Sequence, residues 1–330
     1  MPQLVGIARL AADSPQLEAK RRVEYFELPA RKLLAKCDSP RMPFNWMINP
    51  YRGCEFGCKY CYARYTHEFM ELREPEDFER KIFAKHFDRR SFLGDLRKLP
   101  RGETISIGSA TDPYQPAERR YGLTRSILEV FAETSGYRLG LITKSDLIVR
   151  DIDVFQEIAK RHYLTLVLTV TTMDRELARL LEPMAPRPDL RVSAIRKLTQ
   201  AGLHVTVNCC PILPLINDSE ASMDAVAKSA GQAGATRIGA NVVYLKPCAL
   251  NVFLPFLDQH FPHLSRKYRE RFEKVAFLRG AYPEMIQERL ARIRRRYGLD
   301  AKPDREQPEL WPSEETRQLA LFSSLSESNG

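Results

Sequence analysis

Residues 49–62, Asn49-Pro-Tyr-Arg-Gly-Cys-Glu-Phe-Gly-Cys-Lys-Tyr-Cys-Tyr62, decide the fold of this chain. They place Cys54, Cys58 and Cys61 at C-x3-C-x2-C spacing directly after a β-rich run. Three thiolates in so short a loop converge on three corners of one iron–sulfur cube, and the two glycines of the motif permit the backbone angles that wrap it. Three ligands for four irons leave one iron open, as a catalytic metal site requires. The spacing therefore predicts a catalytic [4Fe–4S] cluster.

A structural zinc site is the competing interpretation of the same loop. Structural zinc usually adds a second Cys/His pair at knuckle spacing, and the sequence has none. The other cysteines, Cys37, Cys209, Cys210 and Cys248, lack ligand spacing, so no second cluster motif is expected.

The distribution of the seven cysteines also bears on the compartment. An odd number, with three crowded into one loop, argues against a secreted disulfide framework and for a reducing compartment. Residues 1–10 lack a basic segment followed by an apolar core, and no run approaches the roughly eighteen apolar residues of a membrane span. We therefore expect a cytoplasmic protein with no membrane contact.

The formal net charge of +9 is unevenly distributed over the 330 residues. Much of the excess lies in residues 20–36 and 266–296. Such a basic field speeds the encounter with a polyanion, but helices also expose arginine for solubility alone. Charge by itself leaves nucleic-acid binding open.

Strand-like and helix-like segments alternate from residue 44 onward. The expected strands are 44–48, 104–107, 137–142, 164–170, 204–208 and 237–243, and the expected helices between them are 77–96, 124–133, 151–161, 189–200 and 219–232. Such alternation predicts parallel strands with right-handed crossovers, and six units make a barrel that is incomplete beside the eight of a TIM barrel. The prediction is an α/β fold, a partial (β/α)6 TIM-like barrel with a basic helical C-terminal extension and a flexible tail.

Four segments follow from this pattern. We expect a polar N-terminal extension at 1–40, the barrel at 41–260, basic helices at 264–277 and 283–297 within an extension at 261–300, and the flexible tail at 301–330. Polar or cysteine residues follow the end of each expected strand, and parallel strands place these ends on one face. That face should carry the chemistry.

The cysteine motif, with Tyr60 just before its third cysteine, resembles the signature of the radical S-adenosylmethionine (SAM) superfamily. The resemblance spans roughly residues 44–257 and implies the same partial barrel. It also implies SAM chelated to the open iron and cleaved reductively to methionine and a 5′-deoxyadenosyl radical that abstracts a substrate hydrogen. An electron donor such as flavodoxin or ferredoxin is implied as well.

Within the superfamily, the chain is similar to the branch related to spore photoproduct lyase in residues 49–62, 111–116, 143–145 and 211–218. This resemblance implies a set of SAM contacts. Thr111 and Asp112 would approach the methionine moiety, Lys144 would pair with its carboxylate, Thr171 or Thr172 would bond the ribose, and Tyr60 would lie near the adenine. The alternatives are that residues 111–113 form only a turn and that Lys144 is a helix-end charge.

One position departs from that branch. Spore photoproduct lyases keep a hydrogen-donating cysteine just after the second strand, where this chain has Ser109. A serine O–H bond is too strong for that role. Cys209 and Cys210 end the fifth expected strand on the same face and are candidates for a substitute catalytic thiol, or else buried structural cysteines.

The tail contains Gln318-Leu319-Ala320-Leu321-Phe322 in a polar, Ser-rich setting. It resembles the peptide with which bacterial repair and replication proteins dock on the sliding clamp. Gln318, Leu319, Leu321 and Phe322 would be its partner-binding residues, unless the segment is a short helix packed on the barrel.

Three functions fit these observations. The first is a radical SAM enzyme acting on DNA, a repair-like lyase for a lesion or a modified base that must be flipped to reach a buried radical. The second is a radical SAM enzyme modifying a peptide, a protein or a small metabolite. The third is a non-catalytic iron–sulfur redox regulator, which would have no need of the SAM contacts.

Overall fold

The computed structural model describes residues 4–20, 23–29, 32–40, 42–300 and 308–312. Its main sheet has the strand order β11-β10-β9-β8-β7-β4-β3. The strands are β3 (Leu34–Lys36), β4 (Trp46–Ile48), β7 (Thr104–Ile107), β8 (Arg138–Thr143), β9 (Tyr163–Thr169), β10 (Val205–Asn208) and β11 (Arg237–Gly239). From β4 to β11 every neighbouring pair is parallel, and β3 adds an antiparallel edge to β4. The partial (β/α)6 barrel is thereby confirmed.

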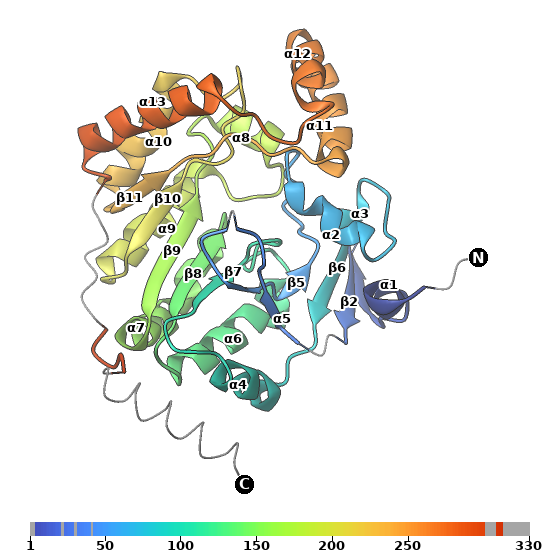
Figure 1. Ribbon diagram of the computed structural model, residues 1–330, viewed down its shortest axis with the longest axis vertical. Coiled ribbons are helices and arrows are strands. Elements are labelled where there is room, and N and C mark those ends of the chain that lie inside the picture. The colour runs from blue at the N-terminus through green and yellow to red at the C-terminus, as the bar shows by residue number, and fades with distance from the viewer. Residues whose placement is uncertain (1–3, 21–22, 30–31, 41, 301–307, 313–330) are drawn as a thin grey trace.

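Helices cover the outer face of this sheet (Figure 1). They are α4 (Arg89–Arg97), α6 (Leu123–Ala132), α7 (Ile152–Arg161), α9 (Pro188–Gln200) and α10 (Glu220–Gln232). Alternate strand residues such as Leu139, Leu166 and Val205 are buried with the apolar faces of these helices in the largest core cluster. This packing explains why the strand-rich segments between amphipathic helices form a parallel sheet.

A second sheet, in the order β1-β2-β6-β5, was not expected. Its strands are β1 (Gln16–Lys20), β2 (Val23–Leu28), β5 (Tyr51–Arg52) and β6 (Lys81–Lys85). Residues 1–40 are therefore more than a polar extension, since α1 (Gly6–Ala12), β1, β2 and β3 form within them.

The single helix expected over residues 77–96 was wrong. The segment divides into α3 (Asp77–Arg80), β6 and α4. Ile82, Phe83 and Ala84 are consecutive buried residues, which is typical of a strand covered on both faces. β6 runs parallel to β2, a partner far away in the sequence, so only tertiary pairing reveals it.

The C-terminal part is helical, as expected for 264–277 and 283–297, although α11 precedes these helices. α11 (Pro247–His260) and α12 (Pro262–Phe272) form a hairpin, and α13 (Ala281–Tyr297) lies against α10 (Figure 1). The division of the chain into four segments stays a prediction. The expected clamp peptide, with Gln318, Leu319, Leu321 and Phe322, lies outside the described residues.

Short elements complete the described part of the chain: the 3-10 helices η1 (Tyr62–Arg64) and η2 (Asp146–Asp151), and α2 (Tyr65–Glu68), α5 (Glu118–Tyr121) and α8 (Arg175–Leu181). A second core cluster joins the cysteine loop to α11 and α12 through Phe56, Phe253 and Tyr268. Within the described ranges, no helix combines the length and the apolar character that a membrane crossing needs.

Candidate active site

The cysteine loop begins at Gly53, directly after β5. Gly53 has a φ of 79°, and an added Cβ would stand 2.7 Å from the Lys81 carbonyl oxygen and 2.8 Å from that of Phe78. The next amide, that of Cys54, donates to the Phe78 carbonyl over 2.9 Å. Because only glycine fits here, the loop can pass close to the start of β6 and turn its cysteines toward the barrel.

The three thiols of the loop lie in a largely buried environment. Cys54 and Cys58 are buried, and Cys61 is partly exposed. Burial raises the pKa of Cys58 to about 12, against the lowering effect of the Lys144 ammonium. Burial also raises the pKa of Cys61, against the lowering effects of Arg64 and Lys144. Lys144 thus favours the thiolate forms of Cys58 and Cys61, and Arg64 favours that of Cys61.

This donor set fits an iron–sulfur cluster. Soft thiolates are the ligands such clusters take, and coordination removes the thiol protons. Throughout the ranges that the structure covers, no three His, Cys, Asp or Glu side chains are grouped as ligands of one metal ion. Thiolates that hold a cube bind different irons, so their spacing is wider than that around a single ion.

The loop after β7 supports the cysteine loop. Thr111 Oγ1 donates to the Gly53 carbonyl over 2.6 Å, and Gln115 Nε2 donates to the same oxygen over 3.1 Å. The Glu55 amide donates to Gln115 Oε1 over 3.0 Å. Thr111 is thus engaged in holding the backbone before Cys54, and its contact with SAM stays a prediction. Gln115 lies within the spore photoproduct lyase-like stretch 111–116, but the sequence assigned it no role.

Asp112 ties the same loop to the end of β8. Its carboxylate accepts from Thr143 Oγ1 over 2.6 Å, from the Lys144 amide over 2.7 Å and from the Tyr114 amide over 2.9 Å. Three donors occupy the carboxylate, and one of them is the Lys144 amide, so in this structure Asp112 positions Lys144. Its predicted contact with SAM is untested.

Lys144 lies between the cysteine loop and the barrel interior. Its Nζ stands 5.7 Å from the centre of the Tyr60 ring. Burial disfavours its charged form, but Cys58 and Glu182 outweigh that effect and raise the pKa of Lys144 above its usual value. Lys144 is therefore positively charged beside the predicted cluster ligands, where it could pair with the carboxylate of a bound ligand.

A buried ion pair beneath Tyr60 was missed by the sequence reasoning. Arg191 of α9 pairs with Glu182 at 2.5 Å, and neither side chain is more than 1% exposed. The Tyr60 hydroxyl donates to Glu182, and so does Thr171 Oγ1 over 2.6 Å. Glu182 and Arg191 do not lie in any recognisable sequence motif, so the sequence alone could not predict that they pair.

The predicted residues after β9 and β10 have different environments. Thr171 Oγ1 also contacts the Cys210 carbonyl at 3.1 Å, whereas Thr172 Oγ1 accepts from the Asp174 amide over 3.1 Å. Cys209 is 1% exposed and belongs to the barrel core. Burial raises the pKa of Cys210 to about 12, and Lys144 is near enough to lower it. Of the two thiols, Cys210 is the one on the Lys144 side.

Two further polar residues form hydrogen bonds near the ends of the barrel strands: Asn217 beside β9, and Ser109 just after β7. Asn217, fully buried, donates to the Thr171 carbonyl over 3.0 Å and accepts from the Leu213 amide over 2.6 Å. Ser109, in place of the branch's cysteine, accepts from Asn49 Nδ2 over 3.2 Å. Its hydroxyl is therefore tied to the residue that opens the cysteine motif.

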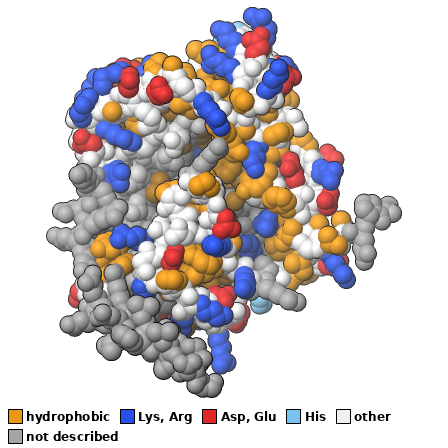
Figure 2. Space-filling view, in the orientation of Figure 1, with side chains coloured by type: hydrophobic (Ala, Val, Ile, Leu, Met, Phe, Trp, Pro, Cys, Tyr) orange, Lys and Arg blue, Asp and Glu red, His pale blue; other side chains and the backbone are white. Residues whose placement is uncertain are grey.

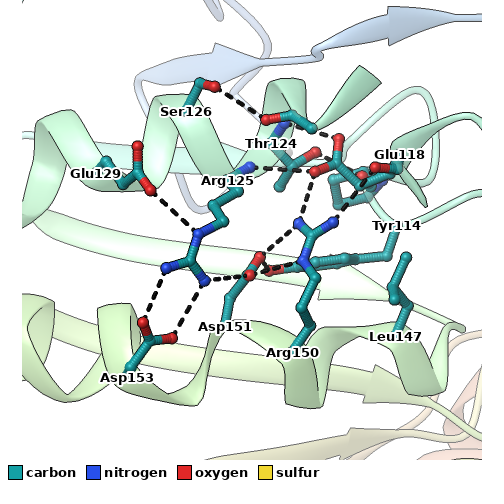
Figure 3. A network of polar contacts seen from close by, with 12 residues as sticks. Tyr114, Glu118, Thr124, Arg125, Ser126, Glu129, Leu147, Arg150, Asp151 and Asp153 are labelled. Carbon is teal, nitrogen blue, oxygen red and sulfur yellow. Dashed lines mark hydrogen bonds and ion pairs between the residues drawn. The ribbon is translucent and has the colours of Figure 1, made fainter. Parts of the chain in front are cut away.

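A network of buried charges lies behind the loop after β7 (Figure 3). Glu118 accepts from the Tyr51 hydroxyl over 2.6 Å, the Thr124 amide over 2.8 Å and Arg150 over 2.7 Å. Arg150 also pairs with Asp151 at 2.8 Å. Because Tyr51 belongs to β5, this network anchors the strand that leads into the cysteine loop.

Comparisons with known proteins agree with this arrangement. The family model described as the Radical SAM superfamily matches residues 48–226. An uncharacterised protein of Mycobacterium tuberculosis is 31% identical over 299 residues, which cover 90% of this chain and 86% of that protein. An uncharacterised protein of Methanocaldococcus jannaschii is 27% identical over 263 residues, covering 78% of this chain and 90% of its own length.

Two solved structures show the same fold. Spore photoproduct lyase complexed with dinucleoside spore photoproduct has a TM-score of 0.58 at 16% identity, covering 83% of this chain and 79% of the lyase. A cysteine-to-serine mutant of spore photoproduct lyase has a TM-score of 0.59 at 16% identity, covering 90% of this chain and 84% of the mutant.

Proposed function

The chain belongs to the radical SAM superfamily, and from this premise we propose that Cys54, Cys58 and Cys61 hold its [4Fe–4S] cluster and that its substrate is DNA. As a radical SAM enzyme it uses such a cluster together with SAM. The observation that carries the site assignment is the buried three-thiol loop at the carboxyl end of the barrel strands, with the Lys144 cation beside it.

The roles of the chain's own residues follow from their contacts. When bound, the cluster supplies the electron that cleaves SAM to methionine and a 5′-deoxyadenosyl radical, which takes a hydrogen atom from the substrate. Lys144 binds the SAM carboxylate and is held in place by Asp112 through its backbone amide. Tyr60, fixed by Glu182, forms one wall of the adenine site, and the buried barrel interior excludes water.

Thr171 and Cys210 lie next to Tyr60, since Thr171 Oγ1 stands 3.3 Å from the Tyr60 hydroxyl and 3.1 Å from the Cys210 carbonyl. Thr171 bonds the ribose, although its hydroxyl already contacts Glu182. Cys210 returns a hydrogen atom to the product radical and is left as a thiyl radical, because Cys210 is partly exposed on the side of Lys144, while Cys209 is sealed in the core. The reaction class we propose is a repair-like lyase reaction.

A basic surface at the barrel mouth supports DNA as the substrate. Figure 2 shows Lys and Arg side chains gathered over α12. Those exposed on α12 and just after it are Arg266, Lys267, Arg269, Arg271, Lys274 and Arg279. The segment after α12 reaches the barrel, since the Leu245 amide donates to the Ala276 carbonyl over 2.8 Å. Phosphate groups are the natural partners of such a surface.

The test is anaerobic reconstitution followed by incubation with SAM, dithionite and deuterated oligonucleotides. Deuterium in the 5′-deoxyadenosine would identify DNA as the hydrogen source. A matched reaction with a deuterated peptide tests the second function class. If SAM is cleaved but only the peptide delivers deuterium, the DNA assignment is wrong and the radical SAM assignment stands.

Three partner and compartment assignments stay predictions. The clamp peptide lies outside the described residues, and the electron donor and the cytoplasmic location rest on the sequence alone. Loss of clamp binding on removal of residues 318–322, measured with purified clamp, checks the first of these.

A further inference from the structure

Two cations lie beside the cysteine loop. Arg52 ends β5, two residues before Cys54, and Lys85 ends β6. Arg52 is opposite Phe83 in the antiparallel β5–β6 pair. Because side chains alternate along a strand, Arg52, Phe83 and Lys85 project from one face of this sheet.

Each of these cations is half-buried. Arg52 Nη1 donates to the Thr66 carbonyl over 3.2 Å, while Arg52 Nε is buried without a hydrogen-bond partner among the described residues. Burial, together with the nearby Arg52 guanidinium, lowers the pKa of Lys85 to about 7. In the part of the chain that the structure describes, no ion pair joins Arg52 or Lys85 to a carboxylate. Buried charges are normally paired, so this arrangement is incomplete as it stands.

A third cation stands nearby at the barrel mouth. Lys246, the residue before α11, has its Nζ 3.6 Å from the centre of the Tyr65 ring. Arg52 acts on the same ring, since it lowers the pKa of the Tyr65 hydroxyl against the raising effect of burial. Arg52 Nη1 also reaches the neighbouring Thr66 carbonyl, so both cations lie beside residues 65–66. Figure 2 shows Lys and Arg side chains among hydrophobic ones near the centre of this face, below α12.

We propose that Arg52, Lys85 and Lys246 form a binding site for a phosphate group. This inference rests on the proposed function for the source of the phosphate, which is the backbone of the nucleic acid. Phosphate oxygens would accept from the exposed part of the Arg52 guanidinium and from the two ammonium groups, and arginine's planar fork suits phosphate geometry. With Arg52 two residues from Cys54, a phosphate held here would set the distance of its nucleotide from the cluster loop.

The first test uses Lys85→Gln and Lys246→Gln, with Lys81→Gln as the matched control. Lys81 lies on the same strand as Lys85 but is already paired with Asp77 at 2.9 Å. Binding of a fluorescein-labelled single-stranded oligonucleotide to the reconstituted, SAM-loaded protein is measured by anisotropy at several KCl concentrations.

Each of the two site variants should bind about tenfold more weakly, as expected for loss of a charge-assisted contact. Each should also reduce the slope of log K against log salt, by at most about 0.7, the value for one phosphate contact on a single strand. Lys81→Gln should match the wild type within about twofold. Equal effects of Lys85→Gln and Lys81→Gln would overturn the proposal.

The second test needs no variant. An amine-reactive reagent is applied to the wild-type holoprotein near pH 7, and labelled lysines are identified by mass spectrometry. Inorganic phosphate or the oligonucleotide should protect Lys85 several-fold, and Lys81 should be unaffected. Protection by phosphate without any oligonucleotide binding would keep the anion site and refute nucleic acid as the substrate. Protection by neither would refute the site, whatever the fate of the DNA assignment.

Discussion

Glu118→Gln should destabilise the protein strongly, although it replaces one side chain by another of nearly the same shape. Glu118 is fully buried, and its carboxylate faces donors from Tyr51, Thr124 and Arg150. The amide would turn an NH₂ group toward donors that need an acceptor, and it would leave Arg150 with Asp151 as its remaining carboxylate partner in Figure 3. The variant would then bury a donor without an acceptor next to Arg150, whose positive charge would be only partly compensated.

The cost of breaking such a buried pair is about 3–5 kcal/mol. For a chain of 330 residues the unfolding entropy near the midpoint is about 0.7 kcal/mol/K, so the melting temperature should fall by roughly 4–7 °C. The matched control is Glu129→Gln, since Glu129 bonds Arg125 of the same network over 3.1 Å but is 46% exposed. An exposed pair contributes at most about 1 kcal/mol, or roughly 1.5 °C here.

The assay is thermal melting of both variants and the wild type, purified without oxygen and compared at equal iron content. Circular dichroism reports the loss of helix. The visible absorbance of the iron–sulfur cluster reports whether the cysteine loop after β5 stays intact. A melting temperature of Glu118→Gln within about 1.5 °C of the wild type, or no lower than that of Glu129→Gln, would refute the claim that the network anchors β5.

Three further outcomes are expected. Gly53→Ala should lose most of the bound iron, because its Cβ would meet carbonyl oxygens at 2.7 and 2.8 Å, while Gly102→Ala, also at positive φ but with open space, should keep it; iron analysis decides. Cys58→Ala should abolish cluster absorbance and SAM cleavage, whereas Cys37→Ala should retain both. Burial lowers the pKa of Lys85 from 10.5 to about 7, so the folded protein binds fewer protons than the unfolded chain between those values and its stability rises with pH there. Lys85→Met should therefore stabilise the protein most below pH 7, with the gain fading toward pH 10, as melting in phosphate-free buffer at several pH values would show.

Local patterns carried much of the fold prediction. The strands expected at 104–107 and 204–208 correspond to β7 and β10, because a short apolar run between amphipathic helices encodes a buried parallel strand along the chain itself. The same logic failed at 77–96, where α3, β6 and α4 follow one another in close succession. β6 exists because β2 and β5 pair with it, and no local period records a distant partner.

By itself, the sequence determined the spacing of Cys54, Cys58 and Cys61, the barrel that presents them and the family to which the chain belongs, since each can be read from short local patterns along residues 48–226. The tertiary structure alone decided which polar groups are already satisfied. Thr111 and Asp112 form hydrogen bonds with backbone groups, and Glu182 forms an ion pair with Arg191 next to Tyr60. Arg52 and Lys85 lie near each other, and neither forms an ion pair with a carboxylate among the described residues. Burial and hydrogen-bond or ion pairing depend on residues brought together from distant strands. They determine the protonation states in a site and which of its polar groups remain available to bind a ligand.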